Sequence, residues 1–112
     1  MEVVILTDRH RGSYRVIEEL YERSFARLGL RVHKEATPAT LSAREDLSQK
    51  HSGRVVFHNT LGDGFVPLKK CRNVALPAHE WNRCPQPWVE LLNAFDAVWV
   101  TTSHVSRLLM ES

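Results

Sequence analysis

The sequence predicts an α/β domain with a parallel sheet of five strands between layers of helices. Two observations favour this class. Short, continuous apolar runs alternate along the chain with longer segments whose apolar residues recur at helical spacing. Nearly every apolar run also passes into a polar turn, as strands do before the next helix begins. The alternation therefore predicts a three-layer, doubly wound, Rossmann-like sheet, for which we expect the strand order 3-2-1-4-5.

The first strand and helix are expected within about the first thirty residues. Residues 3–6 form a continuous β-rich run, which is typical of a strand buried on both faces of a parallel sheet. A polar turn follows, with Ser13 as the expected N-cap of a helix and Gly29 as its stop. Apolar residues recur at helical spacing between these two signals: Val16, Ile17, Leu20, Tyr21, Phe25 and Leu28.

The middle of the chain predicts two more strands and a short helix. Residues 30–33 alternate in polarity, so a second strand is expected nearer the sheet edge. Residues 41–50 are mostly polar and indicate a short surface helix. Residues 54–58 form the third expected strand, and residues 72–77 form the fourth, closed by a proline.

The last part of the chain repeats the pattern. Pro85 and Pro87 open an expected helix, because proline is tolerated in the first helical turn. Residues 97–101 form the fifth expected strand. Ser103 then caps a final expected helix whose apolar face carries Val105, Leu108 and Leu109.

Composition limits the classes of function. The 112 residues suit one domain, residues 1–112, and the hydrophobic share of 43% is ordinary for a soluble protein. A net charge of +2, dispersed along the chain, does not favour nucleic acid. No apolar run is long enough for a signal peptide or a transmembrane segment. Cys71 and Cys84 lack metal or redox spacing and predict reduced thiols in a cytoplasmic protein. No histidine pair has helical ligand spacing, so no metal is expected.

Polar residues gather after the strands. The carboxyl ends of parallel strands meet at one edge, where ligands bind in such sheets. For single residues there are structural alternatives: His79-Glu80 could be a surface loop, and Asp8 could simply close the first strand. His58 could satisfy buried backbone groups, and Trp81 and Trp88 could be core residues. The polar residues at this edge are Asp8, Arg9, His10, Arg11 and Ser13 after the first strand, His58, Asn59 and Thr60 after the third, His79, Glu80 and Trp81 after the fourth, and Thr101, Thr102 and Ser103 after the fifth.

Known cofactor loops are absent from the sequence. Gly12 stands alone in the first turn, so the glycine pattern of dinucleotide binding is missing, and no glycine-lysine phosphate loop occurs. No nucleophile elbow is present either. We therefore expect no cofactor.

Residues 74–110 resemble the N-terminal domain of a GT-B fold glycosyltransferase of the group 1, or family 4, type. Several features occur in the order of that family's pattern: Glu80, Trp81, Pro87, Trp88, Asp96, residues 98–100 and Ser103. The resemblance implies a retaining, metal-independent transferase, with His58 and the His79-Glu80 loop on the acceptor side of a cleft. The single glycine, Gly12, departs from the glycine-rich acceptor loop of the family.

The resemblance also implies that this chain and a second domain bind different substrates. The partner is a sugar or glycan acceptor, whereas a nucleotide-sugar binds only with a second domain, which these residues lack; the chain alone is expected to be inactive. The alternative function is a non-enzymatic Rossmann-like module that binds a partner or forms a homodimer. The expected catalytic residues are His79 and Glu80, and the expected substrate-binding residues are Asp8, His10, Arg11, Gly12, His58, Asn59, Trp81, Thr101 and Ser103.

Overall fold

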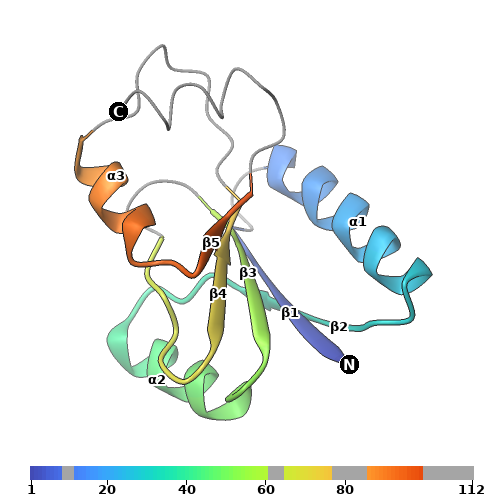
Figure 1. Cartoon of the computed structure of the whole chain (residues 1–112), viewed down its shortest axis with the longest axis horizontal. Coiled ribbons are helices and arrows are strands. Elements are labelled where there is room, and N and C mark those ends of the chain that lie inside the picture. The colour runs from blue at the N-terminus through green and yellow to red at the C-terminus, as the bar shows by residue number, and fades with distance from the viewer. Residues whose placement is uncertain (9–11, 61–64, 77–85, 100–112) are drawn as a thin grey trace.

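The computed structural model describes residues 1–8, 12–60, 65–76 and 86–99 (Figure 1). Strands and helices alternate through most of this part of the chain, as expected. The elements in order are β1 (Glu2–Thr7), α1 (Gly12–Arg27), β2 (Arg31–Ala36), α2 (Leu41–Lys50), β3 (Val55–Asn59), β4 (Arg72–Ala75), α3 (Gln86–Asn93) and β5 (Ala97–Val98).

Within the described residues the sheet has five parallel strands, which confirms the predicted fold class. The predicted order 3-2-1-4-5 is wrong, because the observed order is β2-β1-β3-β4-β5. Strand β3 lies in the interior of the sheet, where Val56 and Phe57 are buried on opposite faces. Strand β2 alternates polar residues and is only half-buried, so it suits the edge. The chain therefore passes from β2 through α2 across β1 to β3.

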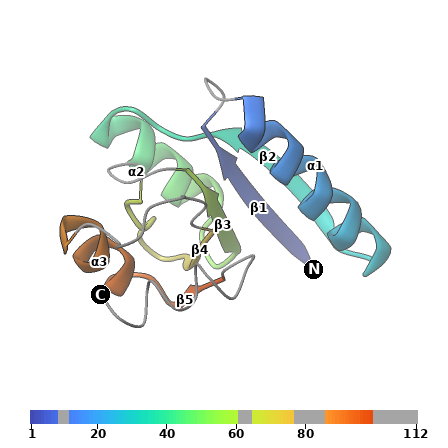
Figure 2. The same cartoon turned by 90° about the horizontal axis from the view of Figure 1, so that it is seen from above.

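Helices cover both faces of the sheet, which gives three layers. Helix α1 lies on one face, along β1 and β2, and helices α2 and α3 lie on the other (Figures 1 and 2). On the first face, Val3 and Ile5 pack with Phe25 of α1. On the second, Val4 and Leu6 pack in a separate cluster. Alternate residues of β1 thus supply two cores.

The helix ends show how the local sequence sets the elements. Gly29 adopts a positive φ of 81°, and the amide of Leu30 donates to the carbonyl of Phe25 at 3.0 Å, which closes α1 as predicted. The predicted N-cap at Ser13 is wrong, because α1 already begins at Gly12. The expected surface helix is present as α2, with Thr40 as its N-cap.

Candidate functional site

The candidate site lies at the carboxyl ends of β1 and β3. From β1 the chain turns through α1 to β2 on one side, whereas from β3 it continues towards β4 on the other. This is the switch point of a doubly wound sheet with this strand order, where ligands bind outside the strand ends. The amide of Asp8 donates to the carbonyl of Asn59 at 3.1 Å, so the two strands stay paired up to this edge.

Thr7 and Asn59 form a buried polar pair at the switch point. They are opposite each other in register, and both are 0% exposed. Because Ile5 and Phe57 on the same strand faces pack against α1, the side chains of Thr7 and Asn59 also face α1. Asn59 Nδ2 donates to the carbonyl of Tyr14, in the first turn of α1, at 2.8 Å. The pair thus ties the sheet edge to the start of the helix.

Acceptor atoms of this pair lack partners. Thr7 Oγ1 and Asn59 Oδ1 are buried without a hydrogen bond, and so is Thr37 Oγ1 just after β2. The amide of Thr37 donates to the carbonyl of Thr7 at 3.0 Å, which places all three residues at one edge. An unpartnered buried polar atom costs about 1–3 kcal/mol, so each one calls for an explanation, such as a bound water or ligand. Glu18 Oε2 and His58 Nδ1 are also buried without partners, away from this edge.

His58 faces the opposite side of the sheet. Its ring packs edge-on against Phe95, with centroids 4.7 Å apart, and its Nε2 lies 2.8 Å from Asn73 Oδ1. Burial lowers the pKa of His58 to about 4, although the hydrogen bond to Asn73 acts in the other direction. His58 is therefore neutral near pH 7 and packs as a core residue in the described part of the chain.

Asn73 makes several hydrogen bonds on this second face of the sheet, a role that was not predicted from the sequence. Its Nδ2 donates to the carbonyls of Leu68 and Cys71, at 3.0 and 3.2 Å. Its Oδ1 accepts from the amide of Leu68 at 2.9 Å, as well as from His58. The amide of Asn73 donates to Asp96 Oδ2 at 2.7 Å. One side chain thus holds the loop before β4 against the sheet.

The structure brings only part of the predicted site together. Asp8 follows β1, Gly12 begins α1, and Asn59 ends β3, so these three lie around the switch point. His58 lies next to them along the strand but points to the other face. The remaining predicted residues lie outside the described residues: His10, Arg11, His79, Glu80, Trp81, Thr101 and Ser103.

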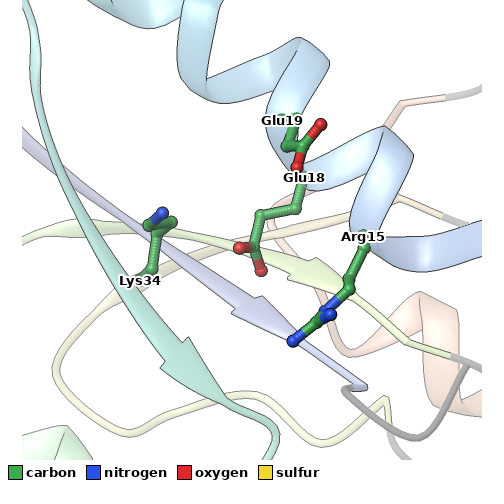
Figure 3. Close-up of a pocket in the computed structure, with 4 residues that line it drawn as sticks. All are labelled: Arg15, Glu18, Glu19 and Lys34. Atoms are coloured by element: carbon green, nitrogen blue, oxygen red, sulfur yellow. The ribbon is translucent and has the colours of Figure 1, made fainter. Parts of the chain in front are cut away.

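A separate polar pocket lies between α1 and β2 (Figure 3). It has a volume of about 340 Å³ and is lined by Arg15, Glu18, Glu19 and Lys34. Figure 3 shows the Glu18 carboxylate between the side chains of Arg15 and Lys34. Since two cations face two carboxylates, the pocket has no net charge with which to select an anion.

A network of ionisable groups joins β1, β2 and the end of α2. Arg54 bridges its two halves, with Nη2 3.0 Å from Glu2 Oε2 and Nη1 2.8 Å from His51 Nδ1. His33 hydrogen bonds to Glu2 at 2.8 Å and, together with Arg54, lowers the pKa of that carboxyl group despite its desolvation.

The other half of this network centres on Glu35. His51 Nε2 and Lys50 Nζ both reach Glu35 Oε2, at 2.8 and 2.9 Å. Burial alone would raise the pKa of Glu35, but these hydrogen bonds outweigh it and lower the pKa. Within the ranges described, no three histidine, cysteine or acidic side chains come together as metal ligands would. The network links β1, β2 and the end of α2 through these contacts.

The described helices are too short or too polar to cross a bilayer. Comparison with models of protein families, with curated proteins and with solved structures finds nothing that matches this chain.

Proposed function

We propose that the chain binds a sugar or glycan acceptor at the switch point, as the acceptor-side domain of a glycosyltransferase that uses a nucleotide-sugar. One observation supports the proposal: Thr7 Oγ1, Asn59 Oδ1 and Thr37 Oγ1 are buried without partners at one sheet edge, so a sugar would reach them by opening the contact between this edge and the first turn of α1. A sugar presents hydroxyl groups that both donate and accept, so it can satisfy a hydroxyl and an amide oxygen together. Asp8, which follows β1 at the same edge, adds a carboxylate acceptor.

In this proposal the chain positions the acceptor and does not activate the donor. Transfer would depend on holding the acceptor hydroxyl in line and on stabilising charge in the transition state. A second domain would bind the nucleotide-sugar. His79 and Glu80 are the residues proposed to border the reacting centre, as the family resemblance implies. We therefore expect binding of sugars without turnover by these residues alone.

Replacing Thr7 by valine tests the site directly. Valine has nearly the same shape, and Thr7 Oγ1 has no partner in the described protein, so the change should not destabilise the fold. Loss of one hydrogen bond to a ligand is worth about 1 kcal/mol, or about fivefold in Kd. The matched control is Ser52→Ala, which removes an exposed hydroxyl just before β3, at the opposite edge of the sheet.

The measurement is amide chemical-shift titration with a panel of monosaccharides and disaccharides. We expect shifts at Asp8 and Asn59 in the wild type and in Ser52→Ala, and weaker binding in Thr7→Val. Glu80→Gln should also weaken binding if the loop contributes. The proposal fails if no sugar binds, or if shifts map to the Arg15 pocket. Turnover of nucleotide-sugars by the 112 residues would contradict the proposal that a second domain is needed for transfer.

A further inference from the structure

The polar pocket between α1 and β2, called the Arg15 pocket, places opposite charges side by side (Figure 3). Its volume of about 340 Å³ lies at the small end of the range for ligand pockets. Arg15, Glu18 and Glu19 lie three and four residues apart, so they share one face of α1. Lys34 comes from β2, which packs against that helix. Two packed elements therefore hold the charges in place.

One carboxylate oxygen in this pocket lacks a partner. Glu18 Oε2 is buried without a hydrogen bond, although Figure 3 shows the carboxylate between Arg15 and Lys34. Lys34 instead forms an ion pair with Glu22, one turn further along α1, with Nζ and Oε2 3.0 Å apart. A buried carboxylate oxygen without a donor is unfavourable. Because a carboxylate turns easily about its last torsion, either oxygen of Glu18 can accept from a donor that enters the pocket.

The arrangement of charges selects the class of ligand. A lone cation would be repelled by Arg15, and a lone anion would be repelled by Glu18 and Glu19. An ammonium group brings three donors for a carboxylate, whereas the exposed Arg15 guanidinium matches a carboxylate with two parallel hydrogen bonds. The Cβ atoms of helix residues three apart lie about 5–6 Å from each other, which suits a small molecule carrying both groups.

We propose that the Arg15 pocket binds a free α-amino acid, whose ammonium group donates to Glu18 and whose carboxylate accepts from Arg15. This site is independent of the proposed sugar site, because none of its lining residues belongs to the carboxyl edge of β1 and β3. Binding of amino acids and binding of sugars can therefore succeed or fail separately.

Amide chemical-shift titration with alanine, at constant pH and ionic strength, tests the proposal. We expect saturable shifts at Glu18, Glu19 and Lys34, with Asp8 and Asn59 unchanged. Alaninamide keeps only the ammonium group, and N-acetylalanine keeps only the carboxylate. Each should bind at least about tenfold more weakly, because one charge-assisted hydrogen-bonded contact is lost. Alaninamide also stands for the N-terminus of a peptide, so equal binding of alanine and alaninamide would overturn the choice of a free amino acid.

Two substitutions assign the two ends of the ligand. Arg15→Gln and Glu18→Gln should each weaken alanine binding about tenfold. Arg15→Gln should leave the weak binding of alaninamide no worse, and Glu18→Gln should leave that of N-acetylalanine no worse. The matched control is Arg27→Gln, which removes an exposed positive charge from the last turn of α1, outside the pocket. An equal loss in this control, or no saturable shift with alanine in the wild type, would overturn the proposal.

Discussion

Replacing Asn73 by alanine tests whether one buried amide holds the loop between β3 and β4. Asn73 is 4% exposed and makes four side-chain hydrogen bonds. Alanine would leave the His58 Nε2 proton and both backbone groups of Leu68 buried without partners. The carbonyl of Cys71 is only partly buried, so water can replace its lost contact.

The magnitude follows from these three buried groups. Each unpartnered group costs about 1–3 kcal/mol, and water entering the space left by the amide recovers part of this. We expect a loss of about 3–5 kcal/mol in the free energy of unfolding. Since domains of this size have about 5–15 kcal/mol in total, the variant should still fold in many buffers but with a much lower urea midpoint.

Urea titration followed by circular dichroism measures this loss. Asn93→Ala is the matched control, because Asn93 is exposed, and it should stay within about 0.5 kcal/mol of the wild type. A double-mutant cycle with His58→Leu should show coupling of about 1–2 kcal/mol, because the leucine removes the unpaired donor. A cost below about 1 kcal/mol for Asn73→Ala, or strict additivity in the cycle, would refute the reasoning.

Three further measurements address single features. Because the pKa of His58 falls from 6.5 to about 4 on folding, the unfolded chain binds the proton first as pH falls. Stability should therefore drop by about 3 kcal/mol between pH 6.5 and 4, and His58→Leu should flatten that part of the urea-derived profile; an equal drop in both proteins contradicts this. Gly29→Ala should cost about 1 kcal/mol in thermal melts and Gly29→Asn less, since φ is 81° with no atom within 4 Å of the added Cβ; equal stability of the alanine variant argues against it. The pKa of Glu2, followed by carboxyl NMR, should rise more in His33→Phe than in Arg54→Met, because the hydrogen bond from His33 is its main cause; the reverse ranking would reject that cause.

Local patterns in the sequence were sufficient to predict most elements. The apolar run at residues 3–6 and the stop at Gly29 appear where expected, since both depend on neighbouring residues only. The strand order was mispredicted because it depends on where the α2 crossover places β3. The continuous run Val55–Phe57, set against the polar alternation of β2, is the signal that identifies β3 as an interior strand.

The hydrogen bonds of Asn73 and the unpartnered atoms at the candidate site could not be predicted from the sequence. Asn73 acts through Leu68, His58 and Asp96, which different turns of the chain bring to it. No spacing rule links these residues. At the candidate site, Asn59 was expected from its place after a strand, but Thr7 and Thr37 were not. Their role depends on buried atoms without partners, which only the packed structure reveals.

The hydrogen bond from Asn59 to Tyr14 gives the edge a fixed polarity. Because Nδ2 is held by the carbonyl of Tyr14, the amide cannot turn over, and Oδ1 alone is presented beside Thr7. That oxygen attracts hydroxyl or amine donors and repels phosphate and carboxylate oxygens. If the proposed acceptor binds here, this fixed orientation predicts that the edge favours a neutral polyol over a charged nucleotide.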